Sequence, residues 1–197
     1  MKKVQDHYFH KAKKEGFAAR SVYKLEEIDH KKGLLKPGLR VLDLGCAPGS
    51  WLQYIAVRVG GGGMVLGVDL EPVTVALPPQ ARAVQGDIHL LTPEELLGGG
   101  QGGALFDLVV SDMAPRTTGI PSADAARSAQ LVQRTLDLAG EVLKPGGGLL
   151  AKIFQGSALA DVRRAFGARF QTVSLEKPKA TRSESVEVFL LGRGFKG

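Results

Sequence analysis

Short apolar runs rich in branched side chains recur along the chain from residue 39 to residue 154. The runs are LRVLDLG (39–45), MVLGVDL (64–70), ARAVQGD (81–87), FDLVVSD (106–112) and GLLAKIF (148–154). Helical patterns lie between them, in WLQYIAVRV (51–59) and in a long segment near residues 123–143. Runs of this kind are typical of strands buried on both faces, so the alternation predicts a parallel sheet with helices covering both faces.

The long helix near residues 123–143 carries one apolar stripe and ends at the sequence KPGGG. Two further strands, FQTVSLEK (170–177) and SVEVFLLG (185–192), have no clear helix between them and are expected to form an antiparallel pair at the sheet edge. Glycine clusters at 60–63 and 98–103 predict surface turns. The whole pattern predicts an α/β fold. We interpret the stripe of the long helix as core packing, and its members are Ala129, Val132, Leu136, Ala139 and Leu143.

The first twenty residues form a basic arm in which cationic and aromatic side chains alternate. Such an arm is either a solvated terminus or a contact for RNA, whose phosphates attract the charges while its bases stack on the rings. The segment VYKLEEIDHKK (22–32) predicts a short helix, with Ser21 as its N-cap and Gly33 as its stop signal. We therefore divide the chain into a basic arm, 1–20, and a single domain, 21–197. The cations of the arm are Lys2, Lys3, Lys11, Lys13, Lys14 and Arg20, and its aromatic residues include His7, Tyr8, Phe9 and Phe17.

Composition narrows the possible classes of protein. A chain of 197 residues, 44% of them hydrophobic and 23% charged, suits one compact domain. The terminus MKKVQDHYFHKAKKEG has no hydrophobic stretch, so we expect neither a secretory signal nor a membrane span and predict a cytoplasmic protein. The single cysteine, Cys46, excludes an internal disulfide, and with four scattered histidines no metal site is indicated. The net charge of +6 favours a polyanionic partner, although scattered surface lysines would give the same total.

A glycine-containing loop follows the first strand in VLDLGCAPGSW (41–51), where the backbone can approach a ligand at the start of the next helix. It lacks the G-x-G-x-x-G pattern of dinucleotide-binding folds, which argues against a dehydrogenase. Asp69 ends the second strand, where a carboxylate can accept ribose hydroxyls, and Asp87 ends the third, where it can bind an adenine amino group. Strand-end acids around such a loop suit S-adenosylmethionine, which is cationic and carries no phosphate. The predicted cofactor-binding residues are Asp43, Gly45, Pro48, Gly49, Trp51, Asp69, Leu70, Asp87, Ile88 and Asp112, and Cys46 is interpreted as a small packing residue.

Lys152 stands within the apolar run LLAKIFQG (149–156), where an ammonium is costly unless it is paired or neutral. Asp112 ends the preceding strand in FDLVVSDMAP, and in a doubly wound methyltransferase order those two strands are neighbours. We therefore expect an ion pair between Lys152 and Asp112 at the carboxyl edge of the sheet. A salt bridge without chemistry is the simpler interpretation of the same pair.

The segments KKEGFAARSVYKLEEI, DLGCAPGSW, SDMAP, AKIFQG and KPKATRSESVEVF resemble, in order and spacing, the FtsJ (RrmJ) family of ribosomal RNA 2′-O-ribose methyltransferases. The resemblance implies a Rossmann-like class I methyltransferase fold, with a seven-stranded, mostly parallel sheet and an antiparallel last strand. It also implies a catalytic Lys-Asp-Lys-Glu tetrad on Lys24, Asp112, Lys152 and Glu187, with Glu184 as the alternative to Glu187.

The resemblance further implies a reaction and a substrate. The cofactor is S-adenosylmethionine, and the implied target is the A-loop uridine of 23S ribosomal RNA within the 50S subunit. A transfer-RNA anticodon-loop methyltransferase and a non-catalytic RNA-binding assembly module are the alternatives. Neutral Lys152 would act as general base, Lys24 and Glu187 would position the ribose hydroxyl, and no metal would be needed. A monomer is the default expectation.

Two positions depart from the family pattern, and neither belongs to the tetrad. Ser50 stands where many relatives have glycine, and Arg116 follows SDMAP where a small or amide residue is frequent. Arg116 is either an added phosphate contact or a surface arginine without a role. The expected RNA footprint consists of the lysines of the arm with Arg20, Lys32, Lys177, Lys179 and Arg182.

Overall fold

The computed structural model describes residues 2–99, 103–182 and 184–197. Helices in this part of the chain are α1 (Lys2–Glu15), α2 (Val22–Lys32), α3 (Ser50–Val59), α4 (Pro93–Gly99), α5 (Pro121–Val142) and α6 (Leu159–Arg169). Its strands are β1 (Arg40–Leu44), β2 (Met64–Asp69), β3 (Ala81–Gln85), β4 (Phe106–Ser111), β5 (Leu143–Phe154), β6 (Phe170–Glu176) and β7 (Glu187–Phe195). Within these described ranges, no helix is both long and apolar enough to cross a membrane.

The strands form one seven-stranded sheet in the order β3-β2-β1-β4-β5-β7-β6. Neighbouring strands from β3 to β5 are parallel, whereas β7 runs antiparallel to both β5 and β6. The predicted fold class is therefore confirmed, including the antiparallel last strand. The expected antiparallel pair at the sheet edge is also present, because β6 is the outermost strand and pairs with β7, which lies between β6 and β5. This insertion pairs Phe154 with Glu187 and brings the start of β7 to the carboxyl end of β5.

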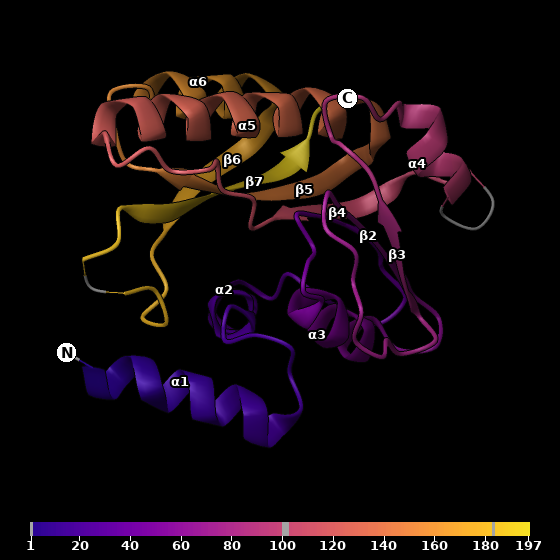
Figure 1. Cartoon of the computed structure of the whole chain (residues 1–197). Coiled ribbons are helices and arrows are strands. Elements are labelled where there is room, and N and C mark those ends of the chain that lie inside the picture. The colour runs from indigo at the N-terminus through magenta and orange to yellow at the C-terminus, as the bar shows by residue number, and fades with distance from the viewer. Residues whose placement is uncertain (1, 100–102, 183) are drawn as a thin grey trace.

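Helices cover the two faces of the sheet in separate layers (Figure 1). The helices α5 and α6 lie on one face, while α2 and α3 lie on the other and α1 lies outside α2. Alternation along β1 supplies both layers, since Leu42 and Leu44 pack toward the α5 side and Val41 packs toward the α3 side. The carboxyl edge of the parallel strands is left for the loops, which is where ligands bind in open α/β sheets.

Several helical predictions need adjustment. The apolar stripe of α5 is buried as predicted, but its last member, Leu143, already begins β5. The helices α4 and α6 were not predicted, and α6 buries only Val162 and Phe166, so its apolar pattern is weak. The cluster 60–63 forms the expected turn, whereas Gly98 and Gly99 close α4 and residues 100–102 lie outside the described residues.

The predicted arm contains a helix, α1, which packs against α2. The phenol of Tyr23 donates a hydrogen bond to Glu15 at 2.9 Å, and the Lys11 ammonium lies 4.1 Å from the centre of the Tyr23 ring. Ser21 was expected to cap α2 but has helical backbone angles and makes no capping bond. Its hydroxyl lies 3.1 Å from that of Ser50 instead, so it joins the start of α2 to α3. Gly33 ends α2 in the left-handed conformation, as predicted.

Candidate active site

Four charged side chains from four distant segments meet at the carboxyl edge of the sheet. Lys24 comes from α2, Asp112 follows β4, Lys152 lies on β5 and Glu187 begins β7. The Lys152 ammonium lies 2.9 Å from Asp112 Oδ1 and 3.7 Å from Glu187 Oε1. The Lys24 ammonium lies 2.9 Å from Glu187 Oε2 and 3.5 Å from Asp112 Oδ1. The predicted pair of Lys152 and Asp112 is thus confirmed, and the structure joins it to the other two residues of the predicted tetrad.

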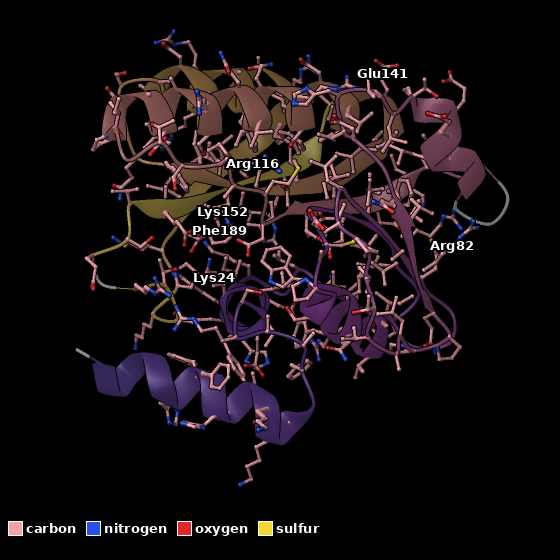
Figure 2. The ribbon with its side chains drawn as sticks, viewed as in Figure 1. Lys24, Arg82, Arg116, Glu141, Lys152 and Phe189 are labelled. Atoms are coloured by element: carbon pink, nitrogen blue, oxygen red, sulfur yellow. The ribbon has the colours of Figure 1, made fainter. Side chains whose placement is uncertain are left out.

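Strand register explains this convergence. Ser111 of β4 pairs with Ala151 of β5. Asp112 and Lys152 are the next residues in the direction of these two parallel strands, so they lie beside each other. On the other side of β5, Lys152 pairs with Phe189 of β7. Because side chains alternate along a strand, Glu187 and Phe189 share one face of β7, and that face looks toward Lys24 on α2. Figure 2 shows Lys152 and Phe189 at the sheet, with Lys24 directed toward them from α2.

The four tetrad side chains are largely withdrawn from water. The Lys152 side chain is 5% exposed and that of Lys24 is 11% exposed. Lys152 also donates a hydrogen bond of 2.6 Å to the backbone carbonyl of Asp112. Burial raises the pKa of Glu187, but the charges of Lys24 and Lys152 outweigh it and hold this pKa below its usual value. Two ammonium and two carboxylate groups together make an internally compensated polar cluster.

Two aromatic side chains support this cluster. Phe189 and Trp51 stack with ring centres 6.0 Å apart, and the Lys24 ammonium lies 6.0 Å from the centre of the Phe189 ring. The Trp51 indole donates a hydrogen bond to the Ser21 carbonyl at 2.9 Å. Trp51, predicted to bind the cofactor, therefore braces the start of α2. The contact of Phe189 with the tetrad was not predicted from the sequence. The available signal was its position two residues after Glu187, which places both side chains on the same face of a strand.

Asp112 also borders a pocket of about 440 Å³ at the carboxyl edge of β1, β2 and β4. Of the predicted cofactor residues, Gly45, Asp69, Leu70, Asp87, Ile88 and Asp112 line this pocket. Asp43, Pro48, Gly49 and Trp51 are not among its lining residues. Arg116, for which the sequence left a phosphate contact or no role, also lines the pocket. The remaining wall residues were not predicted as cofactor-binding, and they are Leu44, Ala47, Val68, Gly86, His89, Met113, Ala114, Pro115 and Leu131.

Backbone contacts shape the pocket floor. Asp69 accepts hydrogen bonds from the amides of Ala47 and Glu71, at 2.9 and 3.0 Å, and so joins the loop after β1 to the end of β2. Gly45 has a φ of 82°, and a side chain there would collide with Met113. Gly49 has a different role, because a Cβ would come within 2.9 Å of Val73, away from the pocket.

Asp43 precedes the pocket-lining Leu44 on β1 and is completely buried. Neither of its carboxylate oxygens has a hydrogen-bond partner in the part of the chain that the structure describes. Burial raises the pKa of Asp43 well above its usual value, and the nearby charges of Asp112 and Asp69 raise it further. An acidic pocket with an unpartnered carboxylate near it suits a cationic ligand. S-adenosylmethionine meets this requirement through its ammonium and its sulfonium.

Cys46 behaves as the predicted packing residue. Its side chain is buried, and a Cβ on Gly67 would come within 2.7 Å of its sulfur. Burial raises the pKa of the Cys46 thiol, aided by the charges of Asp43 and Asp69. A buried thiol with a raised pKa is a poor nucleophile.

The sheet order, the antiparallel β7 and the acidic pocket at the carboxyl edge define a Rossmann-like, S-adenosylmethionine-dependent class I methyltransferase. The model of the FtsJ-like methyltransferase family matches residues 17–195. The chain therefore belongs to the FtsJ-like methyltransferase family, and the resemblance seen in the sequence is confirmed.

Curated relatives extend over nearly the whole chain. Ribosomal RNA large subunit methyltransferase E of Syntrophobacter fumaroxidans is 47% identical over 96% of this chain and 95% of its own length. The protein of the same name from Bdellovibrio bacteriovorus is 48% identical and is matched over 95% of both chains.

Solved structures agree with this assignment. A putative ribosomal RNA methyltransferase from Plasmodium falciparum superposes with a TM-score of 0.82 at 26% identity, over 92% of this chain and all of that one. Aeropyrum pernix fibrillarin, solved with bound S-adenosylmethionine, has a TM-score of 0.64 at 17% identity, over 87% of this chain and 76% of its own. The second likeness concerns the fold alone.

Proposed function

We propose that this protein transfers the methyl group of S-adenosylmethionine to the 2′-hydroxyl of a ribose in large-subunit ribosomal RNA. The family resemblance and the names of the relatives support this substrate, and we propose the A-loop uridine of 23S ribosomal RNA within the 50S subunit as the target. The observation that carries the proposal is the double role of Asp112. This residue lines the cofactor pocket and pairs with Lys24 and Lys152. The proposed site of the methyl donor is therefore directly adjacent to the tetrad.

The chemistry requires removal of a proton from a weakly acidic alcohol. The ribose oxygen forms a bond to the methyl carbon as the carbon–sulfur bond breaks, and the hydroxyl proton passes to Lys152 Nζ. When bound, S-adenosylmethionine supplies the activated methyl group, and sulfur retains the bonding electrons. Lys152 accepts a proton only in its neutral form. The carboxylates of Asp112 and Glu187, at 2.9 and 3.7 Å, hold the ammonium that results.

Lys24 and Glu187 act on the ribose oxygen from the opposite side of the cluster. The Lys24 ammonium can donate a hydrogen bond to the oxygen as negative charge develops on it. Glu187 holds that ammonium at 2.9 Å and also lies 3.7 Å from Lys152 Nζ. The two lysines therefore have different tasks, in which Lys152 takes the proton and Lys24 stabilises the attacking oxygen.

RNA is proposed to approach along the side of the molecule where α1, α2 and the loop between β6 and β7 come together (Figure 1). Glu27 on α2 accepts the backbone amide of Lys179 at 2.7 Å and so holds this loop beside α2. Among the described residues, none of six cations here has an ion-pair partner within 4.0 Å, and these are Lys13, Lys14, Arg20, Lys177, Lys179 and Arg182. Phosphates could neutralise such charges. We do not include Lys32 in the proposed RNA-binding surface, although the sequence suggested it, because its ammonium pairs with Glu176 at 2.6 Å.

Arg20 links this surface to the tetrad. Burial lowers the pKa of Arg20, and the charge of Arg182 lowers it further, while Glu187 acts in the opposite direction. Two guanidinium groups close enough to influence each other would both gain from a phosphate placed between them. We place such a phosphate next to the target ribose.

We also propose that the protein is a monomer and that it acts in the cytoplasm.

The proposal is tested by methylation with labelled S-adenosylmethionine of four substrates: isolated 50S subunits, 30S subunits, free 23S RNA and bulk transfer RNA. Nuclease digestion then separates ribose from base methylation. We expect 2′-O-methylation of the 50S subunit, and its position is mapped by primer extension. Methylation of transfer RNA alone would overturn the substrate, and base methylation would overturn the mechanism.

A further inference from the structure

Asp124 is a buried carboxylate at the start of α5 that the proposed chemistry does not use. It is only 7% exposed. Its Oδ1 accepts hydrogen bonds from the amide and the hydroxyl of Thr118, at 2.7 and 2.8 Å. Its Oδ2 accepts the amide of Gly119 at 3.2 Å, and the Thr118 hydroxyl accepts the amide of Ile120 at 3.3 Å. Asp124 thus fixes a three-residue turn that precedes its own helix.

That turn is the far end of the segment connecting β4 to α5. The segment starts at Asp112 in the tetrad, and the four residues that follow, 113–116, all line the cofactor pocket. Gly119 has a φ of 82°, which lets the chain turn sharply back to Asp124. A weaker tether runs from the Arg127 guanidinium to the Arg116 carbonyl at 3.5 Å. The pocket wall formed by residues 113–116 is therefore held at one end by β4 and at the other end by the turn that Asp124 fixes.

We infer that Asp124 is a positioning residue that holds residues 113–116 in place as the outer wall of the cofactor pocket. This inference rests on the proposed use of that pocket for S-adenosylmethionine. The hydrogen bonds from Thr118 lower the pKa of Asp124, which keeps the anchor ionised at neutral pH. An asparagine in its place would turn an amino group toward one set of N–H donors, so at least one of the three bonds would be lost.

A purely structural role for Asp124 predicts a different outcome. The loss of an anchor that only stabilises α5 would lower the melting temperature and the folded fraction, and would leave the affinities of the folded molecules unchanged. A loosened pocket wall would instead weaken cofactor binding selectively. The cofactor must then order residues 113–116 when it binds, whereas RNA contacts on the α1 and α2 side are unaffected.

The experiment compares full-length D124N with D137N as a matched control. Asp137 lies on the same helix and pairs with Arg169 instead of the pocket loop. Titration calorimetry with S-adenosylmethionine is expected to show about tenfold weaker binding for D124N and less than about twofold for D137N. At saturating cofactor, the kcat of D124N should return to within about threefold of wild type. The affinity for RNA should not change.

Limited proteolysis supplies a readout that does not depend on catalysis. Arg116 is exposed, and trypsin cleaves after arginine, so cleavage between Arg116 and Thr117 reports the freedom of the pocket wall. We expect faster cleavage in D124N than in D137N, and slower cleavage when S-adenosylmethionine is added. A T118V variant loses the two hydrogen bonds of the Thr118 hydroxyl but keeps both backbone amides on the Asp124 carboxylate, so it should show a smaller effect on both measurements.

The inference would be overturned if folded D124N bound the cofactor as tightly as wild type, or lost RNA and cofactor affinity equally. It can be separated from the proposed function, because wild type tests the latter directly. A wild-type protein that binds S-adenosylmethionine without methylating RNA contradicts the proposed function and leaves the Asp124 inference intact.

Discussion

Lys24 Nζ and Glu187 Oε2 lie 2.9 Å apart although the two residues are 163 positions apart in the chain. The contact joins α2, which precedes the sheet in sequence, to β7, which is inserted into the sheet between β5 and β6. Asp112 and Lys152, the two other members of the tetrad, contact this pair. The proposed reaction centre is therefore assembled from segments that are far apart in the sequence.

Substitution of Lys152 should separate chemistry from binding. We expect K152A and K152R to reduce methyl transfer by at least about 100-fold, since neither side chain can serve as the base at neutral pH. K144A is a suitable control, because Lys144 lies near the opposite end of β5 and pairs with Asp107 at 2.7 Å. Single-turnover rates and separate binding titrations test this. A normal transfer rate in K152A would remove Lys152 from the mechanism.

The two candidate glutamates can be distinguished by parallel amide substitutions. Glu187 contacts both lysines of the tetrad, whereas Glu184 is exposed in the loop before β7. E187Q should lower kcat by about tenfold or more, because the Lys24 ammonium loses its carboxylate. E184Q should leave kcat within about twofold of wild type. The reverse ranking would transfer the role to Glu184.

Removal of the Asp43 charge should stabilise the empty protein. The pKa of Asp43 is raised on folding, so the unfolded state releases this proton more readily and the folded state loses stability as pH rises above about 3.8. D43N should therefore increase the free energy of unfolding at neutral pH by an amount on the order of 1 kcal/mol. The gain should diminish toward pH 3, where the wild-type carboxyl is protonated in both states. Urea denaturation at several pH values checks the sign, and calorimetry should show weaker cofactor binding by D43N.

Glu176 should have the opposite pH dependence. Burial raises the pKa of Glu176, but hydrogen bonds from Lys31, Lys32 and Ser174 outweigh it and lower the pKa below its usual 4.5. Its contribution to stability is therefore complete above about pH 4.5 and is lost as pH falls through the folded-state value. E176Q should cost about 1–3 kcal/mol at pH 7 and much less at pH 3.

Glu141 provides the control for this measurement, since it is exposed on α5, far from Lys24 and Lys152 in Figure 2. We expect E141Q to unfold like wild type at every pH. A pH-independent loss in E176Q would show that packing, and not the ion pairs, explains the effect.

Salt should weaken RNA capture more than it weakens chemistry. The affinity for RNA is expected to fall steeply with salt, and a charge-reversal variant, K179E with R182E, should lower both the affinity and the salt slope. R163E with R164E on α6 is the matched control, because α6 lies on the opposite face of the sheet from α2 (Figure 1). Filter binding from 50 to 300 mM salt, about the range in which such slopes are resolved, tests this. A slope unchanged by K179E with R182E would exclude the loop from the interface.

The main architecture could be predicted from the sequence because strands buried on both faces leave a strong apolar signal. The pairing of Asp112 with Lys152 followed from the same logic, since adjacent parallel strands bring their carboxyl ends together. Side-chain direction was harder to predict. Gly49 ends the loop after β1 and Trp51 lies in the first turn of α3, but a Cβ at Gly49 would meet Val73 and the Trp51 ring stacks on Phe189, away from the pocket.

Interactions between distant segments were the least predictable. Nothing local in the sequence marks Glu176 as the ion-pair partner of Lys32. The antiparallel pairing of β6 with β7 at the sheet edge was predicted, but the order of the two strands was not, because strand periodicity reveals which residues are buried and not which neighbour a strand pairs with.

The insertion of β7 has a consequence for how activity is acquired. Both neighbours of β7 precede it in the chain, so the sheet becomes continuous only when this last strand pairs with both of them. Until it does, Lys24 and Lys152 share Asp112 without Glu187. Recovery of methyl transfer during refolding therefore reports closure of the sheet, and should lag behind the recovery of helical signal.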